Sequence, residues 1–346
     1  MKLTNLSHAK LNGIFSAVDA MPDHLRLPYG EDMRDTLTNQ DGEGIHNIVF
    51  CGMGGSALPG NLLKNWLYTR LTVPLEVCRG AQMPGYVNEH SLVIISSYSG
   101  DTAETLHAYE EAKKNNAQIL VITNGGKLLE QAREQNCVVL ELPECDQPRL
   151  AIFAGLRAIT CAIQNMGLVS IDVVRELEDT ADFLNTAKLR LSPDIDEDNA
   201  AKKLAIKLAG KPVIVYASPL LASAAYIWKI SFNEDAKQMA WYNTYSELDH
   251  NELEGWRLPT HKEFGGLQIV SQFEDKGMKK RIQVTTELIK EQGVVFNTMQ
   301  MAGTTPLQEL LYAVIFAGYT AGYCALLNGV DPEKVPQVQK LKAQLS

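Results

Sequence analysis

The chain has 346 residues, 45% of them apolar and 21% charged, so it is long enough for two globular domains, each with its own core. A net charge of −9 and a pI of about 5.4 argue against nucleic-acid or membrane-surface roles, which usually need a basic face. No stretch approaches the roughly 20 apolar residues of a transmembrane helix, and the N-terminus carries no signal-peptide core. The six cysteines form no C-x-x-C pair. These features predict a cytoplasmic protein with reduced cysteines and neither a nucleic-acid nor a membrane partner.

Strand and helix patterns alternate in the first half of the chain. Short apolar runs bounded by turn residues predict strands, and apolar residues at helical spacing predict the helices between them. Strands that alternate with helices form parallel sheets, so we expect a doubly wound parallel-sheet α/β domain preceded by an N-terminal helix. The expected strands are 46–51, 74–78, 92–96, 118–123 and 138–142, and the expected helices are 3–20, 56–68, 102–115 and 128–134.

A proline-bounded segment, 143–148, predicts a boundary or hinge. It divides the chain into predicted domains 1–147 and 148–346. The second domain starts with a mostly helical region interrupted by a polar break at 192–198, after which the alternation resumes and predicts another doubly wound parallel sheet. Whether the halves are structural duplicates stays open at this point. The expected strands are 212–216, 267–273 and 294–299, and the expected helices are 220–237, 276–291, 305–327 and 335–345.

A hydroxyl-rich turn follows the third expected strand. Gly100 favours the turn, and Asp101 or Thr102 can cap the next helix, with Glu104 or Thr105 three residues on. The free N–H groups and the dipole of a helix N-terminus favour an anion, and hydroxyls add donors without adding charge. The hydroxyl side chains are those of Ser97, Ser99, Thr102 and Thr105. The turn therefore predicts a site for a phosphate carried by a small molecule.

A glycine-rich turn follows the first expected strand. Gly54 and Gly55 allow the backbone to pass close to a ligand, and Ser56 offers one more hydroxyl. Because the carboxyl ends of parallel strands meet at one edge of a sheet, we expect both turns to face one crevice.

Two other interpretations of the glycine turn stay open. Gly52, Gly54 and Ala57 match the relaxed dinucleotide fingerprint G-x-G-x-x-A, and Glu76 lies where a ribose-binding acid is expected. Such a lone match is weak, and the hydroxyl cluster suits a single phosphate better than a ribose. Alternatively, the glycines only make a tight connection between strand and helix.

Signatures of metal centres and of serine hydrolases are missing from the sequence. Ser56 lacks the second glycine of G-x-S-x-G, so it is not a nucleophile by pattern. The seven histidines are scattered, with no H-E-x-x-H and no His/Cys cluster. We therefore expect no metal and no cofactor.

Three further polar segments have ordinary explanations when each is considered alone. The run 231–237 fits a solvated helix end, His250 fits a capping or surface histidine, and Arg149 fits a residue at a helix N-terminus.

Taken together, the segments resemble the bifunctional phosphoglucose/phosphomannose isomerase family, whose members contain two sugar-isomerase (SIS) domains. They occur in family order and span nearly the whole chain, and 233–237 and 250–256 make the resemblance specific. The N-terminal extension and the polar insert at 192–198 depart from the family pattern. The matching segments are 52–57, 97–105, 147–149, 233–237, 250–256 and the tail 329–342.

The resemblance implies a metal-independent enzyme of carbohydrate metabolism that interconverts glucose 6-phosphate, and mannose 6-phosphate as well, with fructose 6-phosphate through an enediol. Glu234 would be the proton-transfer base, and His250 would assist ring opening. Arg149 would hold the developing negative charge, and Lys342 would open the ring or position a hydroxyl. The phosphate would be held by Gly54, Gly55, Ser56, Ser97, Ser99, Thr102 and Thr105.

In the family the histidine comes across a dimer interface, so the resemblance also implies a homodimer with active sites between subunits. The competing functions are a non-catalytic SIS-type sensor of sugar phosphates, an SIS enzyme for another phosphosugar and a nucleotide-binding dehydrogenase. The combination of Arg149, Glu234, His250 and Lys342 argues against the sensor.

Overall fold

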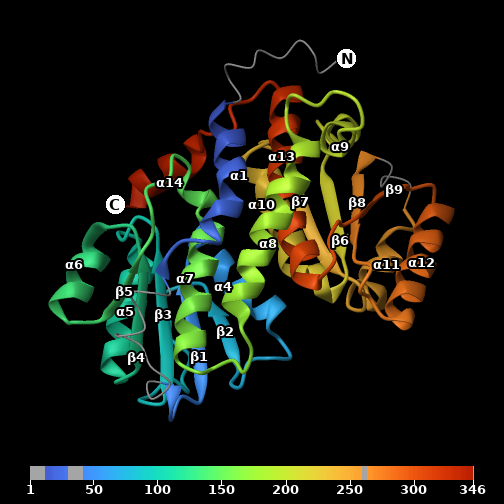
Figure 1. Cartoon of the computed structure of the whole chain (residues 1–346). Helices are drawn as coiled ribbons and strands as arrows, with labels where there is room; N and C mark the ends of the chain where they lie inside the picture. Colours follow the sequence, from blue (N-terminus) through green and yellow to red (C-terminus); the bar gives the residue numbers. More distant parts are fainter. Residues whose placement is uncertain (1–11, 30–41, 259–262, 346) are drawn as a thin grey trace. The chain divides into compact units, whose positions relative to one another are not determined.

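The computed structural model describes residues 12–29, 42–258 and 263–345 (Figure 1). They form two compact units. The first unit comprises residues 20–182, and the second comprises the described residues of 1–19 and 183–346. The predicted domain boundary between residues 147 and 148 remains a prediction, because compact units do not by themselves show which parts of a chain fold independently. The compact units differ from the predicted domains in two segments, because 148–182 group with the first sheet and 12–19 with the second.

A parallel sheet with the strand order β2-β1-β3-β4-β5 forms the centre of the first unit. All five strands were predicted, because each is a short apolar run bounded by turn residues. The order runs outward in both directions from β1 and β3, so the chain reverses its winding between these two strands. The strands are β1 (Asn47–Gly52), β2 (Leu75–Cys78), β3 (Ser91–Ser97), β4 (Gln118–Thr123) and β5 (Val138–Glu141).

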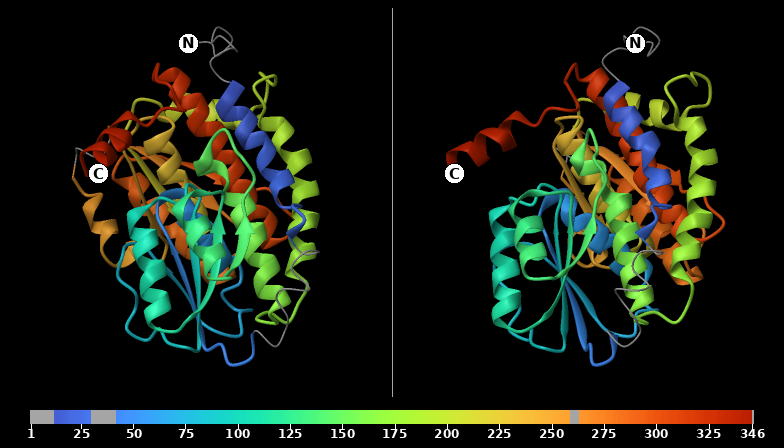
Figure 2. Two further views of the ribbon diagram at one scale, coloured as in Figure 1. Left: turned by 90° about the vertical axis from the view of Figure 1, so that its left-hand side faces the viewer. Right: turned by 60° about the vertical axis from the view of Figure 1, so that its left-hand side comes forward.

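Helices cover both faces of this sheet, as expected for a doubly wound fold (Figure 2). Val49 and Val93 face α5 and α6, whereas Phe50 faces α4. A Cβ at Gly60 of α4 would lie 2.6 Å from the Phe50 ring, so a side chain there would force the helix away from the sheet. The helices are α4 (Leu58–Trp66), α5 (Ala103–Lys114), α6 (Gly126–Glu134), α7 (Ile152–Asn165) and α8 (Val173–Ala187), which runs on into the second unit.

The second unit contains a parallel sheet with the order β7-β6-β8-β9. The sequence predicted three of its strands and missed β7, because an edge strand that exposes Trp241 and Tyr242 contains no apolar run. The strands are β6 (Val213–Ala217), β7 (Ala240–Thr244), β8 (Gly265–Val270) and β9 (Phe296–Gln300). The helices are α9 (Ala200–Leu208), α10 (Ala222–Glu234), α11 (Glu252–Gly255), α12 (Lys276–Glu291), α13 (Pro306–Leu327) and α14 (Pro336–Leu345).

Helix α13 corrects one expectation. It has 22 residues and a mean hydropathy of 1.7, so it is long and apolar enough to span a membrane, alone among the described helices. However, 89% of its apolar window is buried inside the structure, as in the core helix of a globular protein. Part of that cover comes from α1 (Asn12–His24), where the Phe15 ring lies 4.9 Å from the Tyr323 ring and Val18 packs on Gly318.

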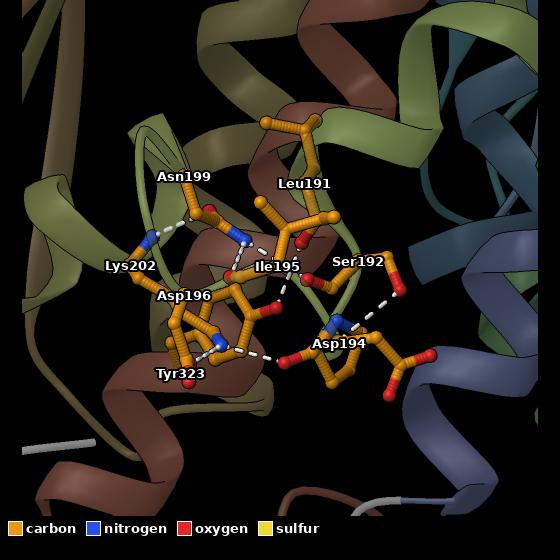
Figure 3. A network of polar contacts seen from close by, with 9 residues as sticks. Leu191, Ser192, Asp194, Ile195, Asp196, Asn199, Lys202 and Tyr323 are labelled. Atoms are coloured by element: carbon orange, nitrogen blue, oxygen red, sulfur yellow. Dashed lines mark hydrogen bonds and ion pairs between the residues drawn. The ribbon is translucent and has the colours of Figure 1, made fainter. Parts of the chain in front are cut away.

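The polar insert between α8 and α9 is held by Asn199, the N-cap residue of α9 (Figure 3). Its amide group donates to the carbonyl groups of Ser192, at 3.0 Å, and Ile195, at 3.3 Å. Its side-chain oxygen accepts from the backbone N–H of Lys202, at 3.0 Å. A fully buried asparagine therefore forms hydrogen bonds with two carbonyl groups of the insert and with a free N–H group in the first turn of α9.

Lys202 connects the same insert to the core of the second unit (Figure 3). Its ammonium group donates to the Pro193 carbonyl at 2.6 Å and to Asp196 Oδ1 at 2.9 Å, and it lies 5.6 Å from the centre of the Tyr323 ring. Only 9% of the Lys202 side chain is exposed. Because the charge lies near the boundary of the core, its hydrogen bonds are little weakened by competition with water.

We predict that Lys202→Ala lowers the free energy of unfolding by about 1–3 kcal/mol, because it removes two charge-assisted hydrogen bonds and the packing of the alkyl chain. Lys203→Ala is the matched control. Lys203 makes an ion pair with Asp198, but its side chain is 60% exposed, so the expected loss is below about 0.5 kcal/mol. Chemical denaturation of both variants measures the difference, and equal losses would contradict the role assigned to Lys202.

Candidate functional site

The glycine turn and the hydroxyl turn of the first unit lie against each other, as expected for turns at the carboxyl ends of parallel strands. β1 and β3 are adjacent and parallel, so both turns leave the same edge of the sheet. The backbone N–H of Tyr98 donates to Ser56 Oγ at 3.1 Å, which joins one turn directly to the other. Ser56 is half-buried and Ser99 is exposed, so the pair of turns is open to a ligand.

Ser97 organises the inside of the hydroxyl turn. Its buried hydroxyl accepts from the Gly100 N–H at 3.2 Å and donates to Thr102 Oγ1 at 3.3 Å. Of the two predicted cap residues, Asp101 and Thr102, Thr102 is the N-cap residue of α5, but its side chain makes no capping hydrogen bond. The Thr105 hydroxyl is buried and has no hydrogen-bond partner among the described residues. The first turn of α5 therefore lacks the side-chain cap that commonly occupies its N–H groups.

A neighbouring glycine pair holds the hydroxyl turn in place. Gly100 has a φ of +71°, and a Cβ there would lie 1.7 Å from the Gly125 carbonyl oxygen, so two stretches of bare backbone meet. The Leu128 N–H donates to the Gly100 carbonyl at 3.0 Å. The sequence interpretation overlooked this support, although the pair Gly125-Gly126 after the fourth expected strand was a usable signal.

Arg149 lies beside the glycine turn. It belongs to a short 3-10 helix (Pro148–Leu150), and a Cβ at Gly55 would be only 3.1 Å from the Arg149 Cα. The Arg149 side chain is half-buried, and its Nη1 donates to Gln147 Oε1 at 2.8 Å. The first unit thus brings Arg149 together with the predicted phosphate-binding residues.

Glu234 is the last residue of α10 in the second unit, and its side chain is half-buried. The helix ends in a tight reversal, in which Lys237 takes a φ of +53° and the Gln238 N–H donates to the Phe232 carbonyl at 2.9 Å. Asn233 Nδ2 donates to the Gln238 carbonyl at 2.9 Å. The charged run after the apolar helix is therefore a fixed helix end, and the position of Glu234 is set by its backbone.

His250 is exposed and lies in a short 3-10 helix (Leu248–His250) between two anchored carboxylates. On one side, Asp249 accepts from Thr285 Oγ1 at 2.7 Å and pairs with Arg281 at 3.0 Å, which attaches the turn to α12. On the other side, Glu252 attaches the turn to the sheet. The histidine is thus presented by a turn whose two ends are held.

The anchor at Glu252 uses both of its oxygens. Tyr216 Oη donates to Oε1 at 2.6 Å, and Asn243 Nδ2 donates to Oε2 at 2.5 Å. Tyr216 and Asn243 are paired neighbours on β6 and β7, so the sheet register itself provides two donors for one carboxylate. Trp256 Nε1 donates to Tyr216 Oη at 2.9 Å, and burial together with Glu252 raises the pKa of the Tyr216 hydroxyl.

The remaining predicted features can be placed briefly. Lys342 belongs to α14, and its side chain lies outside the described residues. Glu76, the acid of the dinucleotide interpretation, accepts a hydrogen bond from Tyr86 Oη. Within the described ranges, no group of three or more His, Cys, Asp or Glu side chains is arranged to hold a metal ion.

Two parallel sheets, the first with hydroxyl-bearing turns at its carboxyl edge, are typical of a protein of the SIS class, and the comparisons agree. The SIS domain family matches residues 44–160, and the bacterial phospho-glucose isomerase C-terminal SIS domain family matches residues 197–345. A tagatose-6-phosphate ketose/aldose isomerase from Escherichia coli shares the fold, with a TM-score of 0.71 at 17% identity, covering 92% of this chain and 93% of that structure.

Curated relatives identify the family. The chain is 34% identical over 340 residues to a bifunctional phosphoglucose/phosphomannose isomerase of Caldicellulosiruptor bescii, covering 96% of this chain and 99% of the relative. It is 33% identical over 318 residues to the same enzyme of Aquifex aeolicus, covering 91% and 93%. The chain belongs to the bifunctional phosphoglucose/phosphomannose isomerase family, which confirms the resemblance and the predicted fold class.

We predict that Glu252→Gln loosens the His250 turn, because an amide cannot accept from both Tyr216 and Asn243. The free energy of unfolding should fall by about 1–3 kcal/mol, and the imidazole NMR signals of His250 should shift or broaden. Glu254→Gln, in the same short helix but in a solvent-exposed ion pair with Arg257, is the control and should change neither. Unchanged His250 signals in Glu252→Gln would contradict the anchoring role.

Proposed function

We propose that this isomerase interconverts glucose 6-phosphate and mannose 6-phosphate with fructose 6-phosphate, without a metal ion, through an enediol intermediate. The observation that carries the proposal is the hydrogen bond between Tyr98 and Ser56, which joins two hydroxyl-bearing turns at one edge of the first sheet in a chain of this family. A phosphate needs several donors that converge without a buried cation, and these turns offer them.

The first unit binds the phosphate in this proposal. The hydroxyls of Ser56, Ser97, Ser99 and Thr102 surround the phosphate oxygens, while Gly54 and Gly55 give access to backbone N–H groups. The uncapped start of α5 supports this role, because its N–H groups and dipole favour a dianion. Thr105 completes the set, since its hydroxyl has no other partner among the described residues.

The chemistry takes place at the other end of the sugar. Glu234 moves the carbon-bound proton from C2 to C1, while a second proton passes from the C2 hydroxyl to O1, so no proton is gained or lost overall. Arg149 stabilises the enediolate oxygen, and binding of the unreactive phosphate provides the orientation. His250 and Lys342 assist ring opening by moving protons between the ring oxygen and the anomeric hydroxyl, which is on C1 of the aldoses and on C2 of the ketose.

We also propose that the enzyme is a cytoplasmic homodimer in which His250 serves the partner's active site. Two features support the dimer: His250 is exposed, and its turn is anchored within its own subunit by Asp249 and Glu252. An exposed but rigid turn can present a side chain to a second chain with little loss of entropy. All six cysteines are free thiols, which fits a reducing compartment.

A coupled assay tests the activity. Purified protein in EDTA should convert fructose 6-phosphate into glucose 6-phosphate and mannose 6-phosphate, each measured separately. Glu234→Gln should reduce kcat by at least about 100-fold with nearly unchanged binding of fructose 6-phosphate, because it removes the base and keeps the shape. Glu291→Gln, at the exposed end of α12, is the control. Sugar-phosphate binding without any product would favour the sensor, and full activity in Glu234→Gln would refute its role.

Mixing two inactive variants tests the shared active site. Glu234→Gln and His250→Ala homodimers should each be nearly inactive, but mixed subunits should recover up to about a quarter of the wild-type activity. In the heterodimer, one of its two sites combines an intact Glu234 with an intact partner histidine, and heterodimers form half of a random mixture. Absence of recovery after verified subunit exchange would show that His250 acts within its own chain.

A further inference from the structure

The turns of the second unit repeat those that we assign to phosphate binding. The order β7-β6-β8-β9 matches β2-β1-β3-β4 in the first sheet, and all the strands are parallel. β1 and β6 are each followed by a short 3-10 helix and then by an α-helix, and β3 and β8 each turn into an α-helix. The turns after β6 and β8 therefore occupy the places of the glycine turn and the hydroxyl turn.

Serine hydroxyls stand at these places in the second unit as well. Ser218 directly follows β6, and Ser271 directly follows β8. The Phe273 N–H donates to Ser271 Oγ at 3.0 Å, much as the Gly100 N–H donates to Ser97 Oγ at 3.2 Å in the first unit. The second unit thus repeats the hydrogen bond between a serine hydroxyl and a following backbone N–H that orders the hydroxyl turn of the first unit.

Two carboxylates of the chain accept hydrogen bonds from these turns. Ser218 Oγ donates to Glu274, and Ser271 Oγ donates to Glu309. The backbone N–H of Gln272 donates to the second oxygen of Glu309 at 3.2 Å. A hydroxyl and a neighbouring N–H that converge on one anion are the contacts that a phosphate would otherwise receive.

Both carboxylates lie inside the fold. The relative exposure of Glu309 is 0% and that of Glu274 is 7%. Glu309 lies in the first turn of α13, where the helix dipole favours a negative charge. Burial raises the pKa of both carboxyl groups above the usual value, and for Glu274 the nearby Asp275 and Glu309 add to the rise. The serine hydrogen bonds and Lys279 offset part of this rise. A buried carboxylate persists only where such donors compensate for its lost hydration.

We propose that the carboxyl edge of the second sheet is a duplicated anion site that the chain fills with its own carboxylates, Glu309 and Glu274, and thereby closes to phosphate. The chain consequently binds one sugar phosphate, in the first unit. This last step rests on the proposed function, but the internal anion site stands without it. A dianion next to two buried carboxylates would lack donors and meet like charges.

Anion rescue tests the proposal. Glu309→Ala leaves the Ser271 hydroxyl and the Gln272 N–H facing an apolar vacancy of carboxylate size, so its Tm should fall. Sodium formate should then raise the Tm saturably above the value in sodium chloride of equal ionic strength, because formate fills the vacancy. Glu309→Gln is the matched control: it retains the side-chain volume, so formate should shift its Tm no more than that of the wild type.

Calorimetric titration gives the second measurement. Wild-type protein should bind one fructose 6-phosphate per chain, and two equal sites per chain would overturn the closure of the second sheet. A folded Glu309→Ala variant that formate does not stabilise would overturn the anion site. If that variant does not fold, Glu274→Ala, which frees the Ser218 hydroxyl, decides by the same formate titration. Lack of isomerase activity would refute the proposed function and leave the formate result unchanged.

Discussion

The parallel pairing of β1 with β3 is the constraint on which the proposed phosphate site depends. It delivers a glycine turn and a hydroxyl turn to the same edge of the sheet, and the hydrogen bond from the Tyr98 N–H to Ser56 Oγ then joins them. A short polar turn buries few apolar side chains, so contacts with neighbouring segments must hold its conformation. Here the contacts are with other backbone segments, above all the one between Gly100 and Gly125.

The two sheets show how one fold gives opposite electrostatic results. In the first unit the hydroxyl of Ser56 is half-buried and that of Ser99 is exposed, and the N-terminus of α5 has no side-chain cap. In the second unit Glu309 and Glu274 accept the equivalent hydrogen bonds and are buried. The fold thus provides a place where donors converge, and a few side chains decide whether a ligand or the protein itself supplies the anion.

In the proposed mechanism the second unit has a different task, which is to hold the side chains of Glu234 and His250 on fixed backbone. Glu234 ends a helix whose reversal is determined by Lys237 and Gln238, and His250 is carried on a turn bound to the sheet through Glu252. The Glu252 anchor is strong because Tyr216 and Asn243 are aligned by the pairing of β6 with β7. Preorganisation of this kind removes an entropic cost from the step in which substrate binds.

The sequence by itself determined the alternation of strands and helices, both parallel sheets, the meeting of the glycine turn and the hydroxyl turn, and the family, because apolar periodicity and turn residues are local signals. It missed β7, because an edge strand with exposed side chains has no apolar run. It also underestimated the apolar length of α13, and only the packing around this helix distinguishes a core helix from a membrane span. Only the tertiary structure decided that Thr102 does not cap α5, that Gly125 supports Gly100, that Glu252 holds the His250 turn and that Glu309 fills the duplicated site. The Thr102 result depends on side-chain geometry, which the sequence does not specify. The other three are contacts between residues that are separated in the chain, so the sequence alone does not show which partners meet.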